Sequence, residues 1–462
     1  MRYRDARRDA RRRGREVTVM SFGVFVTLAV FLVGIFFGLP LGWGFLTSTA
    51  AGLFALDDAL SFMSGTFYHS LDSYVLMGIG FFIFAGSLIS DAGLADRIVR
   101  FSYAVVGRVK GGMIVVGLVA TLIMSALTGS SLPCISALIP LLVPRLEKYG
   151  YKRVYTTAVL CSASFLGYLI PPSVPAMIYC LVAQQSIAAV FLATVFPGLL
   201  LALGYGILNY FICDRYMDPT VAIPPLATEG RARIRELGEA TWSALPALGA
   251  PIVILVGIYG GVFTPNEAGA VVVVYCLIVG FFVYRELNAK SLWSATRSTM
   301  ISLGMIGLLI AGGTVFTRLL IREGAAQALA EGILGLFQNK VLILLSLNVF
   351  LLILGMFIDG IPILILAVPM VLPLIAKLDM NLVHLGSMII VNVGLGVVTP
   401  PYAVSIFVGS RLSGVSYGEL VKPMLLFLCL VGIPVLLLTT YVPALSCWLP
   451  TLLLGKQVVG PW

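Results

Sequence analysis

Long apolar runs recur along the whole chain and are separated by short polar segments. Examples are Phe22–Phe37, Ser73–Ile89 and Ile187–Ile212, which come close to or exceed the roughly 20 residues that a membrane-spanning helix needs. The longest polar segment between two such runs is Asp214–Glu239, which is too short for a soluble domain. The pattern therefore predicts an all-α polytopic membrane protein.

Two apolar runs contain residues that a simple anchoring helix avoids. The run from Met113 to Pro144 is interrupted by Thr128-Gly129-Ser130-Ser131, and the run from Met356 to Val408 holds several polar residues and five prolines. Prolines break the hydrogen-bond ladder of a helix, and polar or charged groups at membrane depth cost free energy. These interruptions point to a function within the membrane.

The second of these runs repeats the first. Shifting it back by 229 positions places Gly396 on Gly167 and superimposes five prolines without a gap. The proline pairs are Pro362 with Pro133, Pro369 with Pro140, Pro373 with Pro144, Pro400 with Pro171, and Pro401 with Pro172. The sequence is therefore interpreted as an internal duplication with about 230 residues in each half.

Basic residues flank the interrupted run of the first half on both sides. They are Arg97, Arg100, Arg108 and Lys110 before it, and Arg145, Lys148, Lys152 and Arg153 after it. Because basic flanks favour the cytoplasmic side, this segment must enter and leave on one side. It is predicted to be a re-entrant hairpin, and non-helical backbone at that depth requires a protein or water-filled surrounding.

The predicted domains follow from this duplication. Residues 1–19 form a basic extension, and the first repeat covers 20–213, with a hairpin at about 111–144 and a proline-broken helix at about 154–182. A cytoplasmic linker covers 214–240. The second repeat covers 241–462, with a hairpin at about 341–375 and a broken helix at about 382–410. The segment Asp57–Asp72 is expected to be a linker, and a span is expected at Thr299–Phe316.

If its hairpin does not cross, the first half crosses the membrane five times. An odd number of crossings gives the second half the opposite orientation in the membrane, so the two halves form an inverted repeat. The eight arginines of residues 1–16 argue for a cytoplasmic N-terminus, whereas this parity places it outside. Either Phe22–Leu56 crosses once, or residues 1–19 are a linker or a misassigned start. We expect the latter, with Met20 as the natural beginning.

The candidate ion ligands are polar groups at the interruptions. Ser130, Ser131, Ser173, Asn392 and Thr399 offer neutral oxygens to a hard cation such as Na⁺, beside carbonyls freed by the helix breaks. Serine and threonine can instead bond back to their own helix.

Asp359 adds the one formal negative charge, and we expect it to be shielded from bulk water. Arg322 lies at a membrane edge, where it is a candidate for attracting a substrate carboxylate.

Other chemistries find little support in the chain. The seven cysteines show no metal-binding spacing, His69 and His384 are isolated, and no GxxxxGK[ST] phosphate loop occurs. An intramembrane aspartyl protease would need two facing aspartates, and only Asp359 lies deep in a span. The net charge of +9 includes the basic N-terminal tail, which is typical of a membrane flank. We therefore expect neither an enzyme nor a nucleic-acid-binding protein.

Several motifs together resemble the large membrane subunit of tripartite ATP-independent periplasmic (TRAP) transporters. They are TGSS, LIPPSVP, GGVFTPNEAGAV, GMFIDGIP, NVGLGVVTPP and TYVPALSCWLP. The resemblance implies an elevator-type carrier of the ion-transporter superfamily in the bacterial inner membrane. It implies Na⁺-driven uptake of organic acids such as C4-dicarboxylates, sugar acids or keto acids, and no cofactor beyond the coupling ion. It also implies two partners, a small four-helix membrane subunit and a periplasmic substrate-binding protein.

The resemblance further implies roles for individual residues. Ser130 and Ser131 belong to the ion site of the first hairpin, and Asp359 and Gly360 to that of the second; Pro172-Ser173 and Thr399-Pro400 complete the two sites. Substrate contacts are expected from Ser130, Asp359, Thr399 and Arg322. The arginine-rich extension departs from the family pattern. A stand-alone Na⁺- or H⁺-coupled carboxylate carrier or antiporter of the same superfamily is the alternative.

Overall fold

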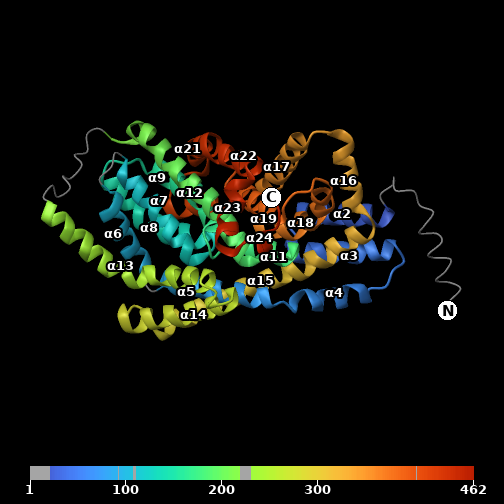
Figure 1. Cartoon of the computed structure of the whole chain (residues 1–462), viewed down its shortest axis with the longest axis horizontal. Coiled ribbons are helices and arrows are strands. Elements are labelled where there is room, and N and C mark those ends of the chain that lie inside the picture. Colours follow the sequence, from blue (N-terminus) through green and yellow to red (C-terminus); the bar gives the residue numbers. More distant parts are fainter. Residues whose placement is uncertain (1–20, 92, 108–110, 219–229, 402) are drawn as a thin grey trace. The chain divides into compact units, whose positions relative to one another are not determined.

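The computed structural model describes residues 21–462 apart from 92, 108–110, 219–229 and 402. Within these ranges the chain is almost entirely helical (Figure 1), and its β-type pairing is an isolated antiparallel bridge between Tyr151 and Met217. The basic extension expected at residues 1–19 lies outside the described residues, as do residues 219–229 of the expected linker.

The helices form two compact units. The smaller unit contains the described residues up to Asp72, Gly307–Ile343 and Ile365–Asp379; the larger contains Ser73–Ile306, Leu344–Leu364 and Met380–Trp462. Each unit therefore combines segments from both halves of the expected repeat. Three helices have residues in both units: α15 (Ala289–Arg322), α17 (Lys340–Phe357) and α18 (Gly360–Lys377).

The smaller unit packs around three phenylalanine rings. Phe31 stacks on Phe45 with ring centroids 4.9 Å apart, and Phe316 tilts against Phe31 at the same distance. Such aromatic pairs add to the packing that holds helices together. Between its first two helices the chain turns at Gly38, whose φ of +78° suits glycine. The helices that belong wholly to this unit are α2 (Phe22–Phe36), α3 (Leu41–Ala55), α4 (Ser61–Leu71) and α16 (Ala325–Leu336).

The larger unit contains the first hairpin and both broken helices. Its elements are α5 (Tyr74–Asp91), α6 (Leu94–Val106), α7 (Gly112–Thr128), α8 (Ser131–Lys148), α9 (Arg153–Ala163), α10 (Leu166–Leu169), α11 (Val174–Ala183), α12 (Ile187–Ile212), η1 (Cys213–Tyr216), α13 (Gly230–Tyr259), α14 (Pro265–Ile278), η2 (Val279–Val283), α19 (Leu382–Val397), α20 (Val404–Ser413), α21 (Tyr417–Phe427), η3 (Leu428–Gly432), α22 (Ile433–Tyr441), α23 (Pro443–Leu454) and α24 (Lys456–Val459). The segments η2 and η3 are π-helical turns that continue α14 and α21.

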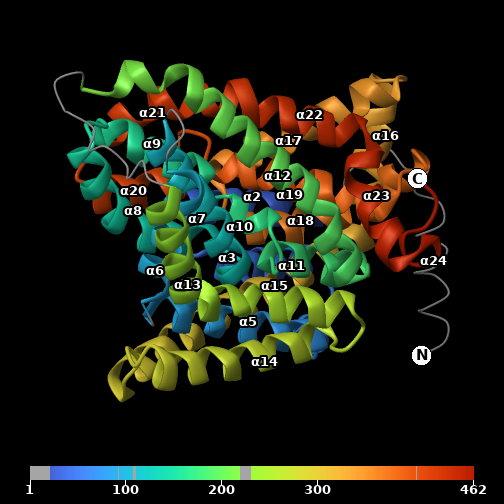
Figure 2. The same ribbon diagram turned by 60° about the vertical axis from the view of Figure 1, so that its left-hand side comes forward.

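Helices from opposite sequence halves pack together in the larger unit. The Cys161 thiol of α9 donates a hydrogen bond to the Ser405 carbonyl of α20 at 3.3 Å, and the Ser164 hydroxyl donates to the Ser405 hydroxyl at 3.2 Å. Figure 2 shows α10, α11 and α12 beside α19, which all of them contact. The two broken helices are therefore neighbours, although more than 200 positions separate them in the sequence.

Seven helices among the described residues are long and apolar enough to cross a membrane, or up to nine if each of two bent pairs is one span. The seven are Ile187–Tyr216, Ile234–Tyr259, Pro265–Val283, Ala289–Arg322, Lys340–Phe357, Gly360–Lys377 and Tyr417–Tyr441. Large apolar side chains such as Phe211, Phe282 and Trp242 are exposed, as expected for a surface that contacts lipid. The predicted all-α polytopic class is confirmed, and the inverted orientation of the repeats stays a prediction.

Helices extend beyond several of the predicted segment boundaries. The expected linker Asp57–Asp72 contains α4, and the span expected at Thr299–Phe316 is the 34-residue helix α15. The 214–240 linker already joins α13 from Gly230 onward. Hydropathy measures suitability for lipid, whereas polar segments without proline also form helices. The sequence pattern therefore underestimated helix length at the ends of the apolar runs.

Candidate functional site

The tip of the first hairpin is a sharp reversal between α7 and α8. Gly129 ends α7 with a φ of +60°, and Ser130 precedes α8 in an extended conformation. The Ser130 side chain makes no capping hydrogen bond, so it leaves the first N–H groups of α8 uncapped. Thr128 bonds back to the Met124 carbonyl at 3.0 Å. The N-terminus of α8 therefore offers a partial positive charge at the tip.

The first broken helix interrupts its hydrogen-bond ladder at Pro171-Pro172, between α10 and α11. The two parts, Arg153–Leu169 and Val174–Ala183, are bent by 41°. Ser173 is fully buried and spans the break: its hydroxyl donates to the Tyr168 carbonyl at 2.6 Å and accepts from the Ala176 N–H at 3.2 Å. The Ser173 hydroxyl is therefore already used by the backbone, which limits its role as an ion ligand.

The hairpin tip and this break are in direct backbone contact. The Val174 N–H donates to the Gly129 carbonyl at 3.1 Å. A Cβ atom at Gly129 would lie 2.4 Å from the Pro172 carbonyl oxygen, and one at Gly167 would lie 2.5 Å from the Ser130 carbonyl oxygen. Both glycines therefore allow a backbone approach that any side chain would prevent.

Tyr168 of α10 connects this region with the tip of the second hairpin. Its hydroxyl interacts with the Ser131 side chain and lies close enough to the Asp359 carboxylate for an electrostatic interaction. A Cβ atom at Gly360 would be 3.0 Å from the Tyr168 ring. The predicted ion-site residues of the two hairpins are thus neighbours of one tyrosine side chain.

Asp359 lies between α17 and α18, and its side chain is accessible to solvent although protein atoms surround most of it. The Gly360 backbone N–H donates a hydrogen bond to it. The expectation that Asp359 is shielded from bulk water stays a prediction. The carboxylate stands at the turn between two helices rather than inside a helix. A carboxylate that solvent reaches and protein largely surrounds can receive a cation and hold it.

The polar residues of the second broken helix are arranged differently. Thr399 is buried and bonds back to the Leu395 carbonyl at 2.6 Å. Asn392 is fully buried and donates to the backbone and side-chain oxygens of Asn348, at 2.9 and 2.8 Å, and Asn348 donates to Thr440 at 3.0 Å. The buried Oδ1 of Asn392 has no hydrogen-bond partner in the described structure. Of the two predicted neutral ligands in the second broken helix, Asn392 is therefore the one that keeps a free side-chain oxygen.

Arg322 belongs to the smaller unit, and its guanidinium is already paired there. It lies 2.5 Å from a carboxylate oxygen of Asp58 and 3.5 Å from one of Glu323, and it stacks 4.9 Å from the centre of the Phe62 ring. A substrate carboxylate would have to compete with Asp58. The role of Arg322 in attracting substrate stays a prediction.

The donors suit Na⁺ better than a transition metal. No group of three or more His, Cys, Asp and Glu residues that could hold a metal ion occurs among the described residues. Carbonyl oxygens at the breaks, the Asp359 carboxylate and Asn392 Oδ1 are hard oxygen donors. Sequence reasoning missed Tyr168 and Asn348, although a tyrosine two positions before the Ile170-Pro171-Pro172 break was an available signal.

We predict that Tyr168→Phe raises the Na⁺ concentration for half-maximal uptake about fivefold, because losing one hydrogen bond costs about 1 kcal/mol. Initial uptake measured against Na⁺ concentration tests this. Tyr205→Phe is the matched control, since Tyr205 is also buried and its hydroxyl has no partner in the part of the chain that the structure describes. An unchanged Na⁺ curve for Tyr168→Phe would show that its hydroxyl does not organise the ion site.

The fold is shared with solved membrane transporters. The structure of Neisseria gonorrhoeae MtrF matches with a TM-score of 0.56 and 12% sequence identity, covering 90% of this chain and 94% of that one. The Alcanivorax borkumensis YdaH transporter matches with a TM-score of 0.54 and 16% identity, covering 90% and 97%. With its apolar helices and interrupted spans, the chain is a multi-pass membrane protein with a transporter fold.

The particular family follows from the sequence comparisons. Residues 28–445 match the family described as "Tripartite ATP-independent periplasmic transporter, DctM component", and the chain belongs to this family. The resemblance to TRAP large permeases is confirmed, and the protein is a multi-pass protein of the bacterial inner membrane. The family members named below are permeases and not enzymes.

Three relatives illustrate the range of this family. The sialic acid TRAP transporter large permease protein SiaM of Vibrio cholerae is 32% identical over 422 residues, 91% of this chain and 97% of that protein. The C4-dicarboxylate TRAP transporter large permease protein DctM of the same species is 31% identical over 456 residues, 94% and 98%. The isethionate TRAP transporter permease protein DctMQ of Oleidesulfovibrio alaskensis is 33% identical over 427 residues, 92% of this chain but only 65% of that protein.

Proposed function

We propose that this chain is the large membrane subunit of a Na⁺-coupled secondary transporter that imports an organic acid delivered by a periplasmic binding protein. A small four-helix membrane subunit completes the carrier. Membership of the DctM family and the names of the relatives support this proposal. The observation that carries it is the gathering of the first hairpin tip, the first helix break and Asp359 around Tyr168.

The chemistry of this region suits an organic anion together with a cation. The uncapped start of α8 favours a negative group, and the Asp359 carboxylate favours Na⁺. The remaining oxygens around the ions would come from side chains or backbone carbonyls. The residues that would supply them are Ser130, Ser131, Pro172, Ser173, Gly360, Asn392 and Thr399. The substrates in the relatives' names are carboxylates or a sulfonate, which agrees with an organic acid as cargo.

The proposal includes an inverted repeat and an elevator motion. The two hairpins and broken helices, at about 111–182 and 341–410, would carry the site across the membrane, and the remaining spans would form the scaffold. The matched prolines and the neighbouring positions of α9 and α20 support a common origin of these segments. Inverted repeats with sites at broken helices are the common architecture of secondary transporters.

Uptake into proteoliposomes tests the coupling. Vesicles that contain both membrane subunits should accumulate substrate only with an inward Na⁺ gradient and with the binding protein outside. A cation gradient is the expected energy source because the chain contains no GxxxxGK[ST] phosphate loop for ATP. Vesicles with K⁺ in place of Na⁺ are the control. Accumulation without the binding protein would instead support a stand-alone carrier, and accumulation without a cation gradient would contradict the proposal.

A further inference from the structure

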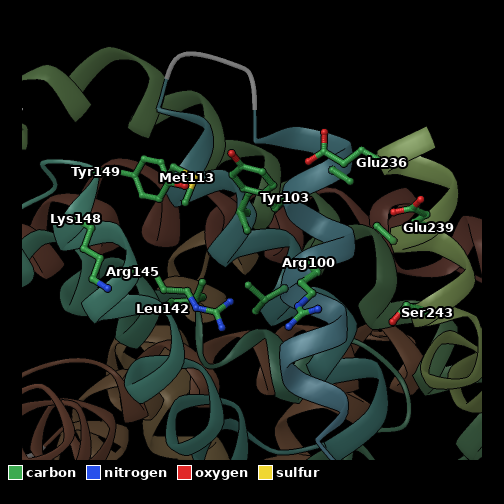
Figure 3. A pocket seen from close by; sticks show the side chains of 14 residues that line it. Arg100, Tyr103, Met113, Leu142, Arg145, Lys148, Tyr149, Glu236, Glu239 and Ser243 are labelled. Atoms are coloured by element: carbon green, nitrogen blue, oxygen red, sulfur yellow. The ribbon is translucent and has the colours of Figure 1, made fainter. Parts of the chain in front are cut away.

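A cavity of about 520 Å³ opens between α6, α7, α8 and α13 of the larger unit, away from the helix breaks described above. Its lining includes five ionic side chains and several apolar ones (Figure 3). The ionic residues are Arg100, Arg145, Lys148, Glu236 and Glu239. The transport mechanism proposed above uses none of them.

The ionic groups are sorted by sign across the cavity. Figure 3 shows Arg145 and Lys148 on one side and Glu236 and Glu239 on the other, with Arg100 between them. The three cations and two carboxylates of the lining sum to a formal charge of +1. Outside the lining, Asp96 pairs with both arginines and Arg235 pairs with Glu239. A ligand with a single charge would be attracted by one wall and repelled by the other. A zwitterion with an anionic and a cationic end satisfies both walls.

The cations keep donors that a phosphate can use. Arg100 and Arg145 share Asp96, at 2.8 and 2.6 Å, and each guanidinium has further N–H groups. Lys148 is exposed and makes no ion pair with any residue that the structure describes. The Tyr103 and Tyr149 side chains stand over this half of the cavity (Figure 3). Guanidinium and ammonium groups are the usual protein partners of phosphate.

The position of the cavity favours a lipid over a soluble ligand. Its lining also contains apolar side chains, namely those of Val99, Ala104, Met113, Val116 and Leu142. Trp242 adjoins the lining residue Ser243 and is 79% exposed, and tryptophan is enriched where membrane meets water. A lining that combines ionic and apolar side chains matches a head group that is continuous with acyl chains.

We propose that this cavity binds a glycerophospholipid whose head group combines a phosphate with a primary ammonium, namely phosphatidylethanolamine. The phosphate contacts Arg100, Arg145 and Lys148, and the ammonium donates hydrogen bonds to Glu236 and Glu239. The bound lipid links α13 to the base of the first hairpin. This inference is independent of the Na⁺ coupling and of the transported substrate.

Native mass spectrometry tests the proposal by measuring how much lipid the purified chain retains in detergent. The lipids that are added carry identical acyl chains and differ only in their head groups. We expect phosphatidylethanolamine to be retained about tenfold better than phosphatidylglycerol, which lacks the cation, and phosphatidylcholine, whose quaternary ammonium cannot donate hydrogen bonds. Equal retention of either lipid would overturn the assignment. Displacement of the lipid by equimolar glycerophosphoethanolamine would show instead that the site takes a soluble head group.

Two variants locate the binding in this cavity. Lys148→Gln and Glu239→Gln should each reduce retention at least fivefold, and Lys148→Arg should restore it. The matched controls are Lys152→Gln and Glu147→Gln, which make the same charge changes at exposed positions outside the cavity. Glu147 forms an ion pair with Arg153, just as Glu239 forms one with Arg235. Melting temperatures without lipid verify folding. Retention that is unchanged in the two cavity variants would overturn the proposal.

Discussion

Asp359→Asn is expected to reduce Na⁺-driven uptake by at least a hundredfold. The side chain is accessible at the turn between α17 and α18 but is largely surrounded by protein atoms, and it is the one carboxylate near Tyr168 and Ser131 that the structure identifies. Asparagine keeps the shape and one oxygen but removes the charge. Loss of an ion-paired charge costs several kcal/mol, and each 1.4 kcal/mol is a factor of ten in affinity.

Initial uptake against Na⁺ concentration measures this effect in the reconstituted carrier. Asp379→Asn is the matched control, because Asp379 is an aspartate with a φ of +49°, a conformation that asparagine also tolerates, in the loop after α18. Expression and association with the small subunit should be normal in both variants. If Asp359→Asn transports with the Na⁺ curve of the wild type, the coupling charge lies elsewhere.

The second large effect is expected for Gly167→Ala. The added Cβ would lie 2.5 Å from the carbonyl oxygen and 2.6 Å from the carbonyl carbon of Ser130, and both are backbone atoms that cannot rotate away. The hairpin tip must therefore move off the first helix break. Overpacking of this kind typically costs about 1–3 kcal/mol in stability. The displaced tip should lower uptake more than tenfold, because the ion ligands on the hairpin and on the break no longer face each other.

Uptake and the melting temperature of the purified protein measure the two consequences. Gly206→Ala is the control, because Gly206 is also helical and has nothing within 4 Å of its Cβ position. Alanine at that position should be neutral or slightly stabilising, since it lowers the entropy of the unfolded chain. Equal activity of Gly167→Ala and wild type would show that the contact between tip and break is dispensable.

Local sequence features were sufficient to place the interruptions. Glycine and proline act on their own backbone, so Gly129 marked the end of α7 and the Pro171-Pro172 pair marked the break before α11. Helix lengths were less predictable, as α4 and the 34-residue α15 show, because hydropathy reports the environment of a segment and not whether it is helical.

The side-chain assignments were less successful than the positions of the breaks. Ser173 and Thr399 lie at breaks, as their sequence positions indicated, but both hydroxyls are used by backbone carbonyls. Asp359 is accessible to solvent and yet largely surrounded by protein atoms, which its apolar neighbours in the sequence alone did not determine. A polar residue in an apolar run marks an unusual position, and its hydrogen-bond partners depend on segments that the run does not contain.

The sequence by itself determined the membrane class, the family and the positions of the helix breaks, because apolar run length, glycine and proline act locally. Only the tertiary structure decided which side chains meet. Tyr168 lies beside Ser131 and Asp359, and Asn392 pairs with Asn348, across separations of 37 to 191 positions that no local pattern encodes. These contacts depend on how the helices pack and on the rotation of each about its axis.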